Sequence, residues 1–129
     1  MEAVAYLDTH VVAWLYAGRT ALLSDLAKDV IDNNLLLISP MVELELQYLY
    51  EIGRVKEPSE NVCGTLGVNL GLQVCSTRFE LVVHAAMGHN WTRDPFDRLI
   101  TAHASLKDAL LLTKDEGIRK NYHRARWQA

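Results

Sequence analysis

Acidic side chains follow two apolar segments that lie at opposite ends of the sequence. Asp8 comes directly after Ala3–Leu7, and Asp115 comes shortly after Ala109–Leu112. If both segments are strands of one parallel sheet, their carboxyl ends lie at the same edge, where ligands of such sheets bind. Carboxylates gathered there repel each other strongly, and a divalent cation relieves the repulsion. Mg²⁺ and Mn²⁺ prefer such oxygen ligands, and a bound cation can activate water and neutralise charge on a phosphodiester.

Two further carboxylates are expected to come from helices. Asp97 lies in the first turn of a helix that is expected to begin at Asp94. Glu43 and Glu45 both lie in the helix that follows the apolar run Leu35–Ile38. Residues two apart point about 200° apart around a helix, so only one of these glutamates can face the site. Their positions alone do not choose between them.

Each acid also has a structural interpretation. Asp8 and Asp115 could each cap the helix that follows them. Asp94 stands directly before Pro95, which is typical of an N-cap, and we assign it that role. Asp97 could stabilise the positive end of the helix dipole. Caps and metal ligands therefore remain competing interpretations of these residues.

The composition indicates one folded domain spanning residues 1–129. Half of the chain is hydrophobic and only 22% is charged, which is enough apolar material for a core. The formal net charge of −3 argues weakly against general affinity for nucleic acids, although a basic segment containing Lys120, His123, Arg124 and Arg126 lies near the end of the chain. A solvated tail is the commoner outcome for such a segment, while guidance of substrate is the alternative.

Cys63 and Cys75 lack zinc-site spacing and are expected to be reduced thiols in or near the core.

Apolar runs alternate with helical patterns along the chain. Strands are expected at Ala3–Leu7, Leu35–Ile38, Leu72–Cys75 and Ala109–Leu112, and helices at 10–17, 24–32, 40–52, 58–70, 77–87, 94–106 and 115–122. Continuous apolar strands separated by helices indicate a parallel sheet that is covered on both faces. The expected fold class is therefore α/β, with three layers (α/β/α) and a central parallel sheet of four to five strands. Because the start of the chain does not resemble a signal peptide and no run is long enough to span a membrane, we expect a cytoplasmic protein.

Four segments resemble the PIN-domain nucleases, and among them the VapC-type toxins of toxin–antitoxin pairs. They are YLDTHVVAWL (6–15), ISPMVELELQYLYEIGRV (38–55), RDPFDRLITAHA (93–104) and LLTKDEGIR (111–119). The RDPFDRLI block followed by LLTKD is the most specific part. The stretch Lys56–Val74 carries no matching motif.

The resemblance implies a PIN-like fold and an endoribonuclease that depends on Mg²⁺ or Mn²⁺. Transferred residue by residue, the acids are Asp8, Glu45, Asp97 and Asp115, and the family pattern around the helical glutamate favours Glu45 over Glu43. The small hydroxyl residues of the same motifs are Thr9, Ser39 and Thr113. They could orient carboxylates or metal-bound water, and helix capping is the equally weighted alternative for each. The resemblance also implies a homodimer and an antitoxin protein as partners.

These features lead to one main hypothesis with two alternatives. In the main hypothesis the four acids hold one or two divalent ions and RNA is cleaved to leave a 5′-phosphate and a 3′-hydroxyl. Arg93 and Arg98 flank Asp94 and Asp97 and could contact the RNA backbone, although surface salt bridges would explain them equally well. His10 and His103 are weaker candidates for a catalytic base, and His103 is expected to be buried. The alternatives are a non-catalytic α/β module that binds RNA or protein and, with less support, a phosphomonoester hydrolase.

Overall fold

The protein is built around a five-stranded parallel sheet with the strand order β3-β2-β1-β4-β5. The computed structural model describes residues 3–128. The strands are β1 (Val4–Leu7), β2 (Leu35–Ile38), β3 (Gln73–Val74), β4 (Leu110–Leu112) and β5 (Ala125–Arg126). The predicted fold class, a parallel α/β/α arrangement with four to five strands, is confirmed.

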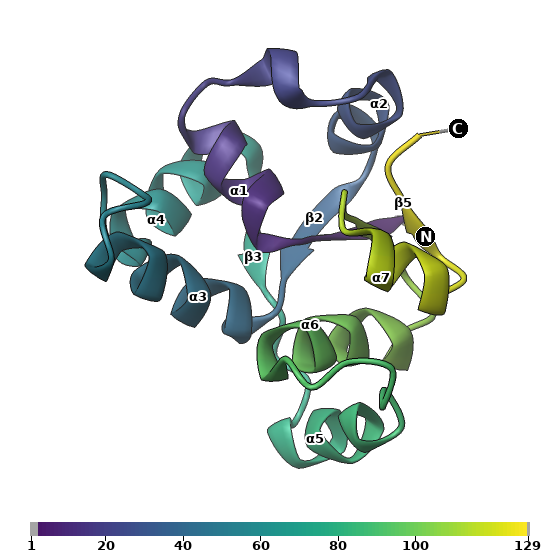
Figure 1. Ribbon diagram of the computed structural model, residues 1–129. Helices are drawn as coiled ribbons and strands as arrows, with labels where there is room; N and C mark the ends of the chain where they lie inside the picture. The colour runs from purple at the N-terminus through teal and green to yellow at the C-terminus, as the bar shows by residue number, and fades with distance from the viewer. Residues whose placement is uncertain (1–2, 129) are drawn as a thin grey trace.

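Helices cover both faces of this sheet. They are α1 (Thr9–Tyr16), the 3₁₀ turn η1 (Thr20–Leu22), α2 (Asp25–Asn33), α3 (Pro40–Glu51), α4 (Ser59–Leu70), α5 (Phe79–Met87), α6 (Pro95–Leu106) and α7 (Glu116–Asn121). Figure 1 shows α1 and α2 on one side of the sheet, and α5 and α6 on the other. Helix α3 packs against both α1 and α6, so it lies where the two helical layers meet.

The central strands are apolar throughout because both of their faces are covered. Side chains of adjacent residues, which point to opposite faces of a strand, are equally inaccessible: Leu111 and Leu112 are both 0% exposed. The polar group of Tyr6 in β1 is hydrogen-bonded inside the core: its hydroxyl donates to Cys75 Sγ at 2.9 Å. Cys75 is buried, Cys63 is half-buried and both are free thiols, which confirms their predicted state.

The expectation of a solvated basic tail is wrong. Residues Ala125–Arg126 form β5, which pairs with β4 in parallel register. Ala125 and Trp127 are 5% and 3% exposed, so alternate residues of this segment belong to the core. The basic residues around them occupy the outward positions of an edge strand, which explains why the composition resembles a tail.

The strand register fixes where the polar ends of β1 and β4 meet. Leu7 pairs with Leu112, which makes Asp8 and Thr113 neighbours at the carboxyl edge of the sheet. The Asp8 backbone N–H donates to the Leu112 carbonyl at 3.0 Å and extends the ladder by one residue. The carboxyl ends of the two central strands are therefore joined where the predicted acids begin.

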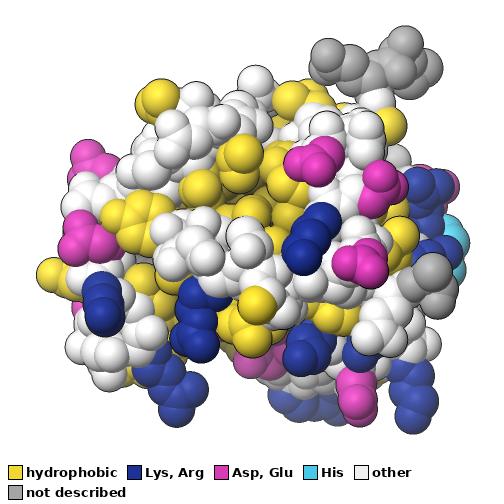
Figure 2. Space-filling view, turned by 90° about the horizontal axis from the view of Figure 1, so that it is seen from above, with side chains coloured by type: hydrophobic (Ala, Val, Ile, Leu, Met, Phe, Trp, Pro, Cys, Tyr) yellow, Lys and Arg dark blue, Asp and Glu magenta, His cyan; other side chains and the backbone are white. Residues whose placement is uncertain are grey.

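The side of the molecule formed by η1 and α2 has a mixed surface. Figure 2 views it from this side and shows hydrophobic side chains gathered near the middle, with acidic side chains around them. Helix α2 itself contributes three exposed acids, Asp25, Asp29 and Asp32. Over residues 3–128, no helix has the length and apolar character needed to cross a membrane.

Candidate active site

Asp8 is held at the carboxyl end of β1 by contacts on both of its oxygens. Its Oδ1 accepts from the Thr9 backbone N–H at 2.8 Å, and this contact makes Asp8 the N-cap of α1. Its Oδ2 accepts from Thr113 Oγ1 at 2.6 Å. Asp8 is only 5% exposed and Thr113 is fully buried. The capping role and a role at the site therefore coexist in one carboxylate.

Glu45 reaches the same edge from α3. Its Oε1 accepts from Thr9 Oγ1 at 2.5 Å, which connects α3 with the first turn of α1. Burial raises the pKa of Glu45, the Thr9 hydrogen bond lowers it, and the Asp8 and Asp94 charges raise it further. Glu43, in contrast, acts on Cys63: burial raises the pKa of that thiol, and the nearby Glu43 charge raises it further. The packing of α3 thus directs Glu45 toward the acids and Glu43 toward α4.

Asp115 joins the network through the end of β4. Its backbone N–H donates to Thr113 Oγ1 at 3.0 Å. Its own Oδ1 accepts from the Ile118 N–H at 2.8 Å and caps α7. Glu45, Thr9, Asp8, Thr113 and Asp115 therefore form one continuous chain of hydrogen bonds across α3, α1, β1 and β4.

Asp97 completes the acidic set from the first turn of α6. Burial and then the charges of Asp94, Asp8, Asp115 and Glu45 raise the pKa of Asp97 to about 7. Asp94 caps α6 by accepting from the Asp97 N–H at 3.1 Å, as predicted. Because each carboxylate acts on Asp97, the field at this edge is strongly negative.

His10, a weaker candidate in the sequence analysis, also lies at the acids. Its Nε2 accepts from the Lys114 backbone N–H at 2.9 Å, so the neutral ring carries its proton on Nδ1. That nitrogen lies 3.6 Å from Asp8 Oδ2. Burial lowers the pKa of His10, and the Asp8 and Asp115 charges oppose this effect. The signal in the sequence is its position in the first helical turn directly after Asp8.

The comparison with family models gives one match, the PIN domain, over residues 5–123. The chain belongs to the PIN domain family. A comparison with curated proteins finds no match for it.

Solved structures share the fold of this PIN domain. One is the structure of VapBC2 from Rickettsia felis bound to a DNA fragment from the VapBC2 promoter. It is 18% identical in sequence, with a TM-score of 0.62, and the match covers 91% of this chain and 92% of that chain. Another is VapBC-1 from nontypeable Haemophilus influenzae, with 16% identity, a TM-score of 0.60 and coverage of 97% and 96%. At these identities the likeness concerns the fold.

The donor set of this PIN domain suits a hard divalent cation, although its side chains are not gathered around one point. Four carboxylates from different elements supply only oxygen donors, and their mutual repulsion is what such a cation would relieve. Within the described part of the chain, however, no three acidic, histidine or cysteine side chains are arranged to hold an ion together. Oxygens of Asp8, Glu45 and Asp115 instead accept internal hydrogen bonds. Shared coordination therefore requires these side chains to turn toward each other.

Other predicted residues serve different contacts. Ser39 Oγ accepts from the Met41 N–H at 3.0 Å and lies 2.8 Å from His103 Nδ1, so it caps α3 and joins it to α6. His103 is 1% exposed, as expected. Arg98 donates to the carbonyls of Ala86 and Met87 and thereby caps the end of α5.

Arg93 is exposed, and its Nη1 donates to the Asn90 carbonyl at 3.0 Å. Of the two arginines that flank Asp94 and Asp97, Arg93 therefore keeps more of its side chain available to solvent, while Arg98 is engaged by α5.

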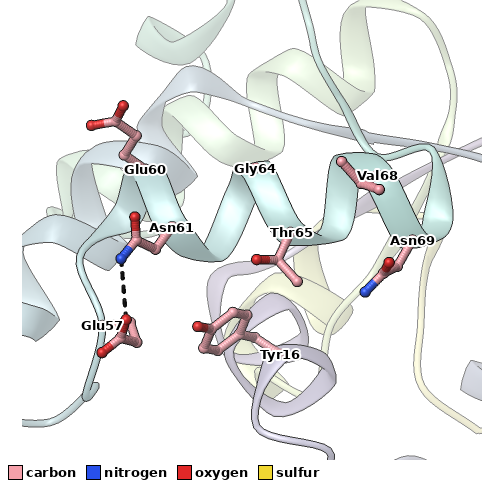
Figure 3. Close-up of a pocket in the computed structure, with 8 residues that line it drawn as sticks. All are labelled: Tyr16, Glu57, Glu60, Asn61, Gly64, Thr65, Val68 and Asn69. Carbon is pink, nitrogen blue, oxygen red and sulfur yellow. Dashed lines mark hydrogen bonds between the residues drawn. The ribbon is translucent and has the colours of Figure 1, made fainter.

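One open surface hollow of this PIN domain lies away from the acids. It is an open groove of about 660 Å³ between the end of α1 and α4. In Figure 3, Tyr16 faces Thr65 of α4, and Asn61 Nδ2 donates to Glu57 Oε1 at 3.1 Å. None of the candidate acids lines this groove. We therefore place the candidate site by its chemistry rather than by the size of the hollow.

Proposed function

We propose that this PIN domain is a divalent-metal-dependent endoribonuclease. The observation that carries the proposal is the hydrogen-bond chain that joins the carboxylates of Glu45 and Asp8, through Thr113, to the backbone N–H of Asp115. Connections of this kind bring the three residues to one edge of the sheet, where their side chains can turn toward a shared cation that relieves the repulsion between their charges. Asp97 adds a fourth carboxylate within range of the same charges.

In this proposal Asp8, Glu45, Asp97 and Asp115 hold one or two Mg²⁺ or Mn²⁺ ions. A bound ion supplies activation of water and neutralisation of charge on the phosphodiester. Thr113 and Thr9 keep the Asp8 and Glu45 carboxylates oriented by donating to them. Hydrolysis breaks the bond between phosphorus and the 3′ oxygen, which leaves a 5′-phosphate and a 3′-hydroxyl. RNA is the substrate class, and exposed Arg93 beside Asp94 is a candidate contact for its backbone.

Asp8→Asn tests this proposal because it keeps the shape of the side chain and removes its charge. We expect the variant to fold, as judged by circular dichroism, and to leave a labelled single-stranded RNA uncut. Asp32→Asn, at an exposed position of α2, is the matched control and should cut as the unmodified protein does. Full cleavage by Asp8→Asn, or by the unmodified protein in excess chelator, would contradict the proposal.

The second candidate function is a non-catalytic module that binds RNA or protein. It is favoured by the capping contacts of Asp8, Asp94 and Asp115, each of which accounts for its acid without any ligand. Equal RNA binding with and without Mg²⁺, together with no cleavage of any RNA tested, would support this candidate over the first.

We further propose that the protein is a VapC-type toxin that forms a homodimer and pairs with an antitoxin protein in the cytoplasm. Support comes from the shared fold of the two VapBC structures and from the two free thiols, which suit a reducing compartment. Expression should arrest growth, and co-expression of the neighbouring gene product should relieve the arrest. Light scattering on the purified chain should give twice its mass of 14.6 kDa.

A further inference from the structure

An aromatic cluster lies directly beside the acids. The rings of His10, Trp14 and Trp127 contact each other edge to face, with centroids 5.0, 6.0 and 5.9 Å apart. Trp127 is 3% exposed, and its carbonyl accepts a hydrogen bond from Ser24 Oγ. The backbone of Trp127, directly after β5, is therefore joined to the start of α2 beside the cluster.

The His10 ring lies close to both Trp14 and Asp8. His10 Nδ1 lies 3.6 Å from Asp8 Oδ2, and the His10 and Trp14 centroids lie 5.0 Å apart. The Lys114 N–H to His10 Nε2 hydrogen bond prevents the His10 ring from rotating freely. A nucleotide whose phosphate is at the acids would thus have Trp14 within reach of a neighbouring base.

Trp14 is only partly buried, and one exposed charged side chain lies over its ring. The Lys114 ammonium lies 5.9 Å from the ring centroid. Lys114 is exposed, and none of the ion pairs found over residues 3–128 involves it. A contact between an ammonium and an exposed ring is weaker than the stacking of a nucleobase on that ring. A base can therefore displace the lysine, whose charge is then available for a phosphate.

We propose that Trp14 is a stacking platform for one base of single-stranded RNA next to the bond that is cut, and that Lys114 contacts the RNA backbone beside it. The inference rests on the proposed function because it concerns the same site. Stacking on an indole requires an unpaired base but accepts any base. The platform would therefore select single-stranded over double-stranded RNA rather than one sequence over another.

The test compares RNA binding with and without the bases. The probes are a fluorescein-labelled single-stranded RNA of twelve nucleotides and an abasic strand of the same length, measured by anisotropy with the Asp8→Asn protein in Mg²⁺. Adding Trp14→Leu should weaken binding of the RNA by about tenfold and leave binding of the abasic strand unchanged. Trp14→Phe, which keeps a ring, should retain most of the affinity. Phe79→Leu, at an exposed aromatic position of α5, should change neither.

Lys114→Gln tests the second half of the proposal. A phosphate contact does not depend on bases, so this change should weaken binding of both strands equally. It should also reduce the slope of log affinity against log salt by about 0.7, the contribution of one phosphate contact to a single strand. Lys28→Gln, on α2, is the matched control and should leave the slope unchanged.

Equal weakening of both strands by Trp14→Leu, or no weakening of either, would overturn the stacking platform. Thermal unfolding of each variant separates a folding defect from a binding defect, and Trp14→Phe keeps the test decisive if Trp14→Leu does not fold. Cleavage of the same RNA by the unmodified protein is measured in parallel. RNA cleavage by the unmodified protein, without a base-specific effect of Trp14→Leu on binding, would reject only this inference. A base-specific effect on binding without any cleavage would reject only the nuclease proposal.

Discussion

Thr9 Oγ1 donates to Glu45 Oε1 over 2.5 Å, and this contact joins the first turn of α1 to the middle of α3. The Thr9 backbone N–H also donates to Asp8 Oδ1, the N-cap contact of α1. One residue therefore sets the positions of two carboxylates that come from different elements. The spacing between these carboxylates depends on a hydroxyl group that carries no charge of its own.

Thr9→Val is expected to weaken the binding of Mn²⁺ by about 10- to 100-fold, the usual cost of losing a group that orients a metal ligand. Valine keeps the shape of threonine but cannot donate to Glu45, whereas Thr9→Ser should retain most of the affinity. Isothermal titration calorimetry with Mn²⁺ measures the change. Thr65→Val, at an exposed position of α4, is the control. Unchanged Mn²⁺ affinity in Thr9→Val would show that Glu45 is not oriented through Thr9.

Glu45→Gln and Glu43→Gln should differ strongly, although the two residues are neighbours on one helix. The Glu45 side chain faces Thr9 and Asp8, while the Glu43 charge acts on Cys63 instead. We expect Glu45→Gln to reduce RNA cleavage by about two orders of magnitude, as the loss of one oriented charged group commonly does. Glu43→Gln should stay within a factor of about two, because half-buried Glu43 lies on another side of α3 and does not touch the site. Equal loss in both variants would point to damage to α3 as a whole.

Asp97→Asn should stabilise the metal-free protein, and more so as the pH rises. The pKa of Asp97 is about 7 in the folded protein and about 3.9 in an unfolded chain. Since the folded state holds the proton more tightly, its stability falls as the pH rises from about 4 to 7, and the loss is complete above that range. Asparagine does not titrate, so it avoids the loss.

The expected gain of Asp97→Asn is on the order of 1–2 kcal/mol at pH 7.5 and close to zero at pH 4. Thermal unfolding in the presence of a chelator measures it at both pH values. Added Mn²⁺ should reverse the order by stabilising the unmodified protein, because a ligand that binds only the folded state raises its stability. Asp32→Asn, at an exposed position of α2, is the control. A gain that is equal at both pH values would mean that the Asp97 charge is not its cause.

Much of the fold follows from the sequence because buried parallel strands are apolar on both faces. The segment Leu35–Ile38 is a strand with the predicted bounds, and Ser39-Pro40 starts α3 as expected. The strand β5 is missed because its two residues lie among basic side chains that resemble a solvated tail. Its buried members become recognisable only when β4 is present to pair with them.

The candidate site follows from the sequence only in part. Strand ends of a parallel sheet share one edge, so the positions of Asp8 and Asp115 are predictable without coordinates. Which glutamate of α3 faces that edge depends on how the helix rotates against α1, and no local pattern encodes this rotation. The contacts of Thr9 and Thr113 depend on side-chain rotamers and on register, so they emerge only from the assembled structure.

Trp127→Ala should destabilise the protein by about 3–5 kcal/mol, as expected for removing a large buried aromatic side chain. The ring is 3% exposed and packs against Trp14 and His10, and the strand before it continues the sheet through a Thr113 N–H to Arg126 carbonyl bond of 3.1 Å. Trp127→Phe should cost less because it keeps an aromatic ring. Arg124→Ala, at an exposed position of the same segment, should stay within about 0.5 kcal/mol. Urea unfolding measures all three variants, and an unchanged midpoint for Trp127→Ala would mean that the end of the chain is a solvated tail after all.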